Sequence, residues 1–297
     1  MSKRVVGVIG GSGVYAIDLL ERAERRVIET PWGAPSGPLT TGSLNGVDVI
    51  FLPRHGEGHV IPPGEVNYRA NIDAMKRVGA TDIISVSACG SFREELGPGT
   101  FIIVDQFIDR TSGRAKSFFG RGCVAHVSMA KPVCPALCDA LEASMRALSI
   151  PHHRGGTYLC IDGPQFSSLA ESRLYRSWGA DVIGMTNMPE AKLAREAELP
   201  YATVAMVTDY DCWREESGHV EVAGILEIMR RNSEAARRLV GDVVGRLGPV
   251  RTMSPLRVER TLDFAIITPP EARDPALVAM LDMVAGRALS GRLASGD

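Results

Sequence analysis

Residues 5–13 of this 297-residue chain read VVGVIGGSG, and this stretch decides the fold class. Val5–Ile9 is a short, β-branched run typical of a buried strand, and a glycine-rich turn follows it at once. Glycines allow the main chain to approach an anion closely, and Ser12 adds a hydroxyl donor. The segment therefore predicts a first strand that ends in either a structural turn or a phosphate loop. A dinucleotide-binding loop is disfavoured, because the glycine spacing does not fit GxGxxG.

Similar apolar runs continue along the chain and alternate with amphipathic helical patterns. We expect further strands at residues 47–52, 82–87, 101–104, 157–161, 181–184 and 201–207. We expect helices around residues 71–78, 137–148, 170–178 and 190–197, and a long one over 225–247. In the first helix the apolar spacing predicts that Ile72, Met75 and Val78 are buried and that Asn71 and Asp73 are exposed. The alternation predicts an α/β, single-domain protein with a mixed, mostly parallel β-sheet and helices on both faces.

The pattern changes after Gly248. We expect residues 1–248 to form the main domain and residues 249–297 to form a C-terminal extension that packs on this domain or on a partner subunit. Within the extension, residues 249–259 are expected to be extended, 262–267 to form an edge strand and 275–288 to form a terminal helix. The last residues, 290–297, are expected to fray.

The composition excludes several classes of protein. A formal charge of −2 does not favour a nucleic-acid partner, because phosphate backbones are bound by clustered basic surfaces. No apolar stretch approaches the roughly 20 residues that span a bilayer, and the first strand is too short and poorly flanked for a signal peptide. The six cysteines are scattered without a CxxC pair, which predicts buried free thiols. Together these features predict a cytoplasmic protein.

Arg54 and His55 follow the predicted strand at residues 47–52. Ligands of open α/β sheets bind at the carboxyl ends of strands, and the planar guanidinium suits phosphate oxygens. His59 lies four residues beyond His55, a spacing that binds metals on helices. Two glycines and a pair of prolines in this segment make a helix improbable, so metal binding is disfavoured.

Two further strand ends carry polar or small residues. The sequence SACGS at residues 87–91 leaves space for a ligand, although tight turn packing explains it equally, and no GxSxG motif supports a nucleophilic serine. The sequence TDYDCW at residues 208–213 places Asp209 and Asp211 beside aromatic rings. Partial burial of Asp209 would raise its pKa and suit it to act as a general acid; a charged surface loop is the alternative. A metal is disfavoured because no third ligand lies nearby in the sequence.

Taken together, the motifs resemble a known family. They are VIGGSG (8–13), RHG (54–56), VNYRANI (66–72), ACGS (88–91), DQFIDRT (105–111), GPQFSS (163–168), AES (170–172), WGADVIGMT (178–186) and TDYDCW (208–213). In this order they resemble the trimeric purine nucleoside phosphorylases, specifically the branch that acts on 5'-methylthioadenosine. The chain differs from the family pattern at residues 161–165, IDGPQ in place of EGPR, and at Asn187-Met188 in place of a Thr-Val pair. The segment before His126 is also shorter, and the tail after Pro249 matches the family poorly.

The resemblance implies a set of site residues. The phosphate site falls on Ser12, Arg54, His55, Ser87, Ala88 and Thr186. Residues that contact the nucleoside would be Phe166 and Ser167 at the base, Met185 at the ribose, Asp209 at N7, Asp211 at the exocyclic amine, Val222 at the 5' substituent and His126 from a neighbouring subunit.

The resemblance also implies a reaction, a phosphate-dependent cleavage that gives adenine and 5-methylthioribose 1-phosphate in purine and methionine salvage. Asp209 would be the catalytic acid, with inorganic phosphate as co-substrate and neither a metal nor an organic cofactor. The expected assembly is a homotrimer. The alternatives are phosphorolysis of methylthioinosine or 6-oxopurine nucleosides, a dinucleotide-dependent oxidoreductase and a non-catalytic purine-binding protein.

Overall fold

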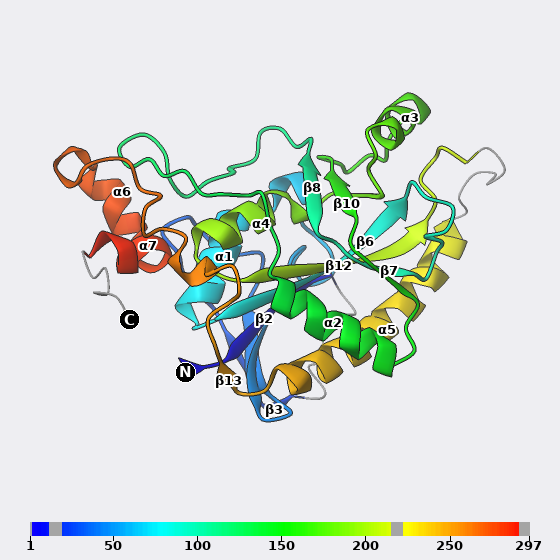
Figure 1. The fold of residues 1–297 in the computed structure, drawn as a ribbon, viewed down its shortest axis with the longest axis horizontal. Coiled ribbons are helices and arrows are strands. Elements are labelled where there is room, and N and C mark those ends of the chain that lie inside the picture. The colour runs from blue at the N-terminus through cyan, green and yellow to red at the C-terminus, as the bar shows by residue number, and fades with distance from the viewer. Residues whose placement is uncertain (1, 12–19, 215–221, 291–297) are drawn as a thin grey trace.

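The computed structural model describes residues 2–11, 20–214 and 222–290, with the side chains of 222–226 left out. Among these residues, eleven strands form one mixed sheet at the centre of the molecule (Figure 1). Its main path runs through β3 (Glu21–Arg26), β4 (Leu39–Leu44), β5 (Val47–Pro53), β2 (Val5–Gly10), β6 (Asp82–Ser91), β11 (Val182–Gly184), β10 (Thr157–Cys160) and β8 (Gln106–Asp109). Strand β12 (Tyr201–Asp209) pairs with β6 and β7 (Phe101–Ile103), and β7 pairs with β9 (His152–Arg154). A separate pair joins β1 (Ser2–Lys3) to β13 (Val250–Arg251).

The long central strand β6 changes neighbours along one edge. Its first half pairs in parallel with β2, from Asp82 to Ser85, and its end pairs antiparallel with β11, at Gly90 and Ser91. Its other edge pairs with β12 along nearly the whole length. On the first edge, no described strand pairs with residues 86–89, so the sheet is open there.

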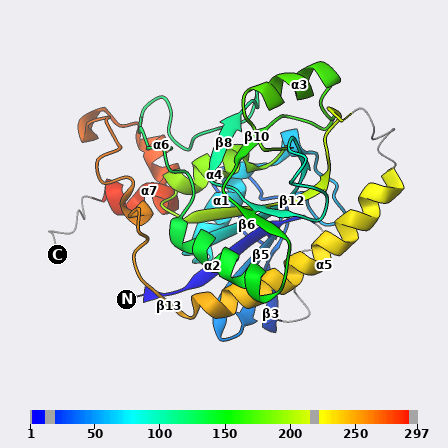
Figure 2. The same ribbon diagram turned by 45° about the vertical axis from the view of Figure 1, so that its right-hand side comes forward.

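The helices form two groups, and β12 contacts both. Helix α2 (Pro135–Ala147) packs against the long α5 (Val222–Leu247), as both views show (Figures 1 and 2). Helix α1 (Tyr68–Arg77) packs against α4 (Asn187–Glu196) and α7 (Asp282–Leu289). Helix α3 (Leu169–Ser177) lies at one end of the molecule, and α6 (Pro275–Met280) and α7 lie at the other (Figures 1 and 2). The α/β class and the mixed, mostly parallel sheet are as predicted from the sequence.

The described part of the C-terminal extension contacts the same chain. Leu281, Val284 and Ala285 belong to the main hydrophobic core, and the ion pair between Arg77 and Asp282 links α1 to α7. Helix α7 is therefore held to α1 by both apolar contacts and charge. No helix in the described ranges has the length and apolar character that crossing a membrane would require.

Several local predictions were wrong. Asn71 and Asp73 are fully buried, because Asn71 bonds to Ser36 through both amide atoms and Asp73 pairs with Arg77. The expected edge strand at 262–267 is a series of turns with one isolated bridge, from Ile266 to Ala125.

Other differences are smaller. The predicted terminal helix is divided at Leu281 into α6 and α7, and the extended stretch after residue 248 contains only the short β13 and a 3-10 turn at Val258–Arg260. Five cysteines are buried free thiols as predicted, whereas Cys212 is exposed.

Candidate active site

A cavity of about 290 Å³ opens at the carboxyl ends of β2, β5, β6, β11 and β12. Ten of the predicted site residues line it: Arg54, His55, Ser87, Ala88, Phe166, Ser167, Met185, Thr186, Asp209 and Asp211. They come from segments far apart in the sequence, and the strand ends bring them together, as open α/β sheets do. Ser12 and the side chain of Val222 lie outside the described residues.

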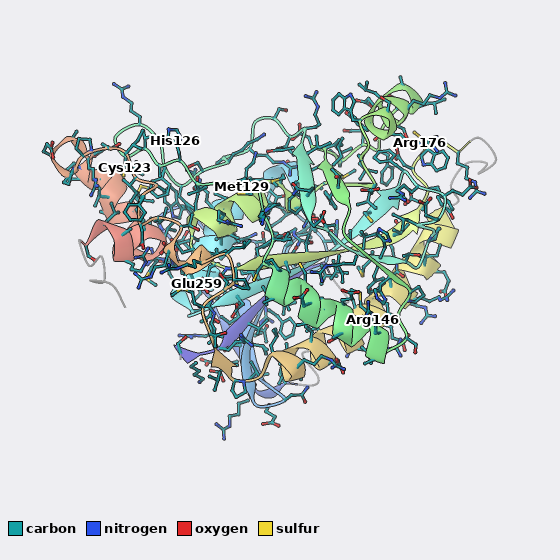
Figure 3. The ribbon with its side chains drawn as sticks, in the orientation of Figure 1. Cys123, His126, Met129, Arg146, Arg176 and Glu259 are labelled. Atoms are coloured by element: carbon teal, nitrogen blue, oxygen red, sulfur yellow. The ribbon has the colours of Figure 1, made fainter. Side chains whose placement is uncertain are left out.

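His126 does not line this cavity. Its main-chain N–H donates to the Ala265 carbonyl at 2.9 Å, beside the bridge between Ala125 and Ile266. Figure 3 shows His126 with Cys123 at the end of the molecule that carries α6, opposite to Arg176 on α3. A role for His126 within the site of its own chain is therefore excluded by its position.

The open edge of β6 forms one wall of the cavity. Ile83 donates its N–H to Pro200 on the β12 side, and Phe92 donates to Asp181 on the β11 side. Because main-chain groups of successive strand residues alternate between the two edges, those of Val86 and Ala88 point toward the opening. The Val86 carbonyl accepts from Nη1 of Arg54 at 3.0 Å, which fits this direction. The main-chain N–H of Ala88 is thus placed to donate to an anion in the cavity.

Arg54 lies almost fully buried at the base of this wall. Its Nε and Nη2 donate to the two carboxylate oxygens of Glu190, at 2.8 and 3.1 Å. Burial alone would lower the pKa of Arg54, but the charge of Glu190 and its hydrogen bonds raise it above the ordinary value. Nη2 also donates to Ser85 Oγ at 2.7 Å. Within the described residues, Nη1 has one acceptor, the Val86 carbonyl, so a second N–H remains for a bound anion.

His55 is neutral at physiological pH. Burial and then the charge of Arg54 lower its pKa to about 4, although a hydrogen bond to the Ile61 carbonyl acts in the opposite direction. Because Nδ1 lies 2.8 Å from that carbonyl, Nδ1 carries the proton and Nε2 is left as an acceptor. The ring stacks on His59, with centroids 4.2 Å apart. A partner with both acceptor oxygens and an O–H group, such as a protonated phosphate, matches this site.

Two carboxyl groups, of Asp209 and Asp211, also line the cavity. Burial raises the pKa of Asp209, Asp211 raises it further, and a hydrogen bond from Thr208 Oγ1 at 2.7 Å partly offsets both. Burial likewise raises the pKa of Asp211, against a hydrogen bond from the Ser172 hydroxyl. Each carboxyl therefore holds a proton more readily than an exposed aspartate, and Asp209, whose pKa the neighbouring Asp211 raises further, is the one suited to donate it.

Loops at the rim provide the remaining predicted contacts. Phe166 is 78% exposed at the mouth, and the hydroxyl of Ser167 is buried with no described partner. Next to them, Ser168 and Glu171 form a reciprocal capping box that starts α3 and fixes the loop before it. Met185 packs against Gly163, where any Cβ would overlap its sulfur.

The sequence reasoning missed some residues of the site. His59, Met206, Thr208, Met229 and Ser233 also line the cavity. Glu190 is buried behind it as the partner of Arg54. A signal for Glu190 exists, because it shares the helical face of Leu193, Ala194 and Ala197, where an acidic residue needs a buried partner. The described residues contain no group of three or more His, Cys, Asp or Glu side chains arranged to hold a metal ion.

Comparison with known proteins agrees with this geometry. The sequence pattern of the Phosphorylase superfamily matches residues 5–245. The S-methyl-5'-thioadenosine phosphorylase of Cereibacter sphaeroides is 60% identical over 289 residues, which cover 97% of this chain and 100% of that protein.

Solved structures give the same result. A methylthioadenosine phosphorylase from an antarctic soil metagenomic library superposes with a TM-score of 0.90 and 44% identity, covering 96% of this chain and 99% of that one. A variant of the adenosine/methylthioadenosine phosphorylase of Schistosoma mansoni, solved with methylthioadenosine, has a TM-score of 0.79 and 38% identity over 84% of this chain and 93% of that one. The chain therefore belongs to the phosphorylase superfamily, and its similar relatives there are methylthioadenosine phosphorylases.

Proposed function

We propose that this chain is a pentosyltransferase that cleaves 5'-methylthioadenosine with inorganic phosphate and releases adenine and 5-methylthioribose 1-phosphate. The observation that carries the proposal is that one cavity is lined both by Arg54, His55 and Ala88, which offer N–H donors and a positive charge, and by the carboxyl groups of Asp209 and Asp211. The names of the similar relatives support the same substrate.

The charges in the cavity suit a dissociative substitution. As the glycosidic bond stretches, the ribosyl ring becomes positive and the purine becomes negative. Phosphate held by Arg54, His55, Ser87, Ala88 and Thr186 would act as the nucleophile and as a counter-charge to the ring. Positioning and electrostatics then provide the rate enhancement, with no covalent enzyme intermediate. The proposed reaction needs neither a metal nor an organic cofactor.

The two carboxyl groups would recognise and activate the base. The raised pKa of Asp209 favours the protonated form, which can donate to N7 so that adenine leaves as a neutral molecule. Asp211 would accept from the 6-amino group. A 6-oxo purine would face Asp211 with a second acceptor, so the site favours 6-amino purines.

We further propose that the protein is cytoplasmic and that three chains assemble into a trimer. In this trimer, His126 of each chain completes the cavity of a neighbouring chain. Phe264 and Ile267, 94% and 59% exposed, lie next to the segment of His126. At the other end, Phe166 at the cavity mouth and Leu174 on α3 are 78% and 47% exposed. Two different apolar patches at opposite ends favour head-to-tail contacts, and a rotation of about 120° between copies would close three of them into a ring.

The reaction is tested by incubating the protein with methylthioadenosine in buffers with and without phosphate and identifying the products. Adenine and a sugar 1-phosphate are expected only when phosphate is present. Equal release of adenine without phosphate would show hydrolysis instead. A higher kcat/KM for methylthioinosine than for methylthioadenosine would move the assignment to 6-oxo purines.

Assembly is tested by light scattering and by activity over a dilution series. A mass near three chains is expected, and His126→Ala should raise the KM for methylthioadenosine while the mass stays the same. A monomer that is fully active at assay concentration would contradict the shared site.

A further inference from the structure

Arg114 is a buried arginine that the proposed reaction does not use. In the sequence it lies in the loop that connects β8 to α2, and its side chain does not line the cavity. An arginine is costly to bury unless its N–H groups find acceptors. The hydrogen-bond acceptors of Arg114 therefore indicate which parts of the structure the side chain holds together.

The guanidinium of Arg114 joins two loops of the cavity wall. Nη1 donates to the main-chain carbonyls of Met185 at 2.8 Å and Met188 at 2.7 Å. Nη2 donates to the carbonyl of Asp162 at 2.8 Å and, more weakly, to that of Ile161 at 3.4 Å. Met185 and Ile161 both line the cavity, so one side chain fixes the distance between two walls.

A third wall segment is attached through Tyr68. Nη1 of Arg114 also lies 3.2 Å from Tyr68 Oη and shares one of its two N–H groups with it, and Tyr68 Oη donates to the Pro63 carbonyl at 3.0 Å. The guanidinium also lies over the Tyr68 ring, 5.4 Å from its centroid. Pro63 also lines the cavity.

The loop that carries Arg114 is itself fixed to the same wall. The Asp162 carboxylate accepts from the main-chain N–H of Ser112 at 3.0 Å and from its hydroxyl at 2.7 Å, and Asp162 Oδ1 lies 3.4 Å from Nε of Arg114. Asp162 belongs to the segment in which this sequence differs from the family pattern.

We infer that Arg114 is a positioning residue that holds the loops at residues 161–167, 184–188 and 61–65 at the separation required by the nucleoside. The inference rests on the proposed function. The planar guanidinium presents N–H groups in several fixed directions, whereas the ammonium of lysine is a single point charge. Lysine at this position can satisfy only part of the carbonyl set and leaves the remaining carbonyls buried without a donor.

The phosphate ligands depend less on Arg114. Ser87 and Ala88 lie in β6, and Arg54 and His55 directly follow β5. Among the predicted phosphate ligands, only Thr186 lies in a loop that Arg114 contacts, and only His55 bonds to the loop at residues 61–65, through the Ile61 carbonyl. Loss of Arg114 should therefore weaken the binding of the nucleoside more than the binding of phosphate. A residue with a purely structural role would change stability without separating the two KM values.

The experiment compares Arg114→Lys and Arg114→Met with the wild type. Small displacements of reacting groups cost up to roughly 100-fold, and we expect the Met variant to raise the KM for methylthioadenosine by about tenfold or more. The KM for phosphate should change by less than about twofold in this variant. The KM of Arg114→Lys for methylthioadenosine should lie between that of the wild type and that of Arg114→Met. Calorimetric titration with adenine compares the affinity of the variants and the wild type for the base, without any reaction taking place.

Arg251→Met is the matched control. Arg251 is largely buried, pairs with Asp82 and Glu259 at β13, and does not line the cavity. Its loss should lower the melting temperature and leave both KM values as in the wild type. A folded Arg114→Met protein with the KM and adenine affinity of the wild type would overturn the inference; if that variant does not fold, Arg114→Lys decides by the same measures. If the wild type has no phosphate-dependent activity, the proposed function fails, and adenine binding still tests Arg114.

Discussion

The buried pair of Arg54 and Glu190 makes a quantitative prediction about Glu190→Gln. In the wild type, Oε1 of Glu190 accepts from Ser85 Oγ at 2.6 Å, Tyr201 Oη at 2.9 Å and Arg54 Nη2 at 3.1 Å, and Oε2 accepts from Arg54 Nε at 2.8 Å. Glutamine has almost the same shape, but it has no charge and only one acceptor oxygen. Its NH₂ group must then face an N–H of Arg54, which cannot accept a hydrogen bond.

The size of the effect follows from the burial of both partners, each of which is at most 2% exposed. Removing one partner of a buried ion pair costs about 3–5 kcal/mol, because the other charge stays buried without compensation. At roughly 2 °C per kcal/mol for a chain of this length, the melting temperature should fall by roughly 6–10 °C. Phosphate should stabilise the variant more than it stabilises the wild type, because the bound anion replaces the missing charge.

The assay is thermal unfolding followed by circular dichroism at pH 7, at one protein concentration, with and without phosphate. Glu196→Gln is the control, because Glu196 is also buried but accepts from uncharged donors, the N–H of Phe118 and the hydroxyl of Ser117. The Ser117 hydroxyl can reverse its role and accept from the amide, so this control should lose little stability. A loss below about 1 kcal/mol in Glu190→Gln would refute the reasoning, since it would show that Arg54 does not need its partner.

Three further predictions concern acids of the chain. Asp209→Asn keeps the shape but removes the proton donor, so kcat should fall by roughly 10²–10⁴-fold with little change in KM; unchanged turnover would contradict a catalytic role. Asp211→Asn can present a donor to a 6-oxo group, so the ratio of kcat/KM for methylthioadenosine to that for methylthioinosine should fall toward one, and an unchanged ratio would remove Asp211 from base recognition. Burial raises the pKa of Glu196 to about 7, so the folded chain binds this proton more tightly than the unfolded chain. The favourable contribution of Glu196 to the free energy of unfolding is fully present below about pH 4.5 and is lost as the pH rises through 7. Glu196→Gln should therefore gain stability relative to the wild type between pH 5 and pH 8 in urea titrations, and a constant difference over this range would contradict the raised pKa.

The sequence predicted those parts of the fold in which local pattern and burial agree. The buried strands β2, β5, β6 and β12 are apolar runs, and the structure confirms each of them within a few residues. Strand β3 was not predicted, because Glu21–Arg26 is charged and exposed and is a strand only through pairing with β4. This is a tertiary effect that no local window contains.

The site was predictable to a similar degree. Strand ends and family resemblance identified the groups that face the cavity, including Arg54 and Asp209. The groups behind them were not identified, because Glu190 meets Arg54, and Arg114 meets Met185, across long separations in the sequence. Periodicity failed for Asn71 for the same reason, since a buried polar side chain with a distant partner looks like a surface residue in sequence.

The change of neighbours along β6 affects how this cavity can evolve. The wall that we propose binds phosphate includes the main-chain N–H of Ala88, and a peptide group persists whichever side chain is attached to it. The proposed contacts to the base are the carboxyl groups of Asp209 and Asp211, which a single codon change replaces. In the proposed site, mutation can therefore alter the choice of base, while the main-chain share of phosphate binding is inherited with the backbone.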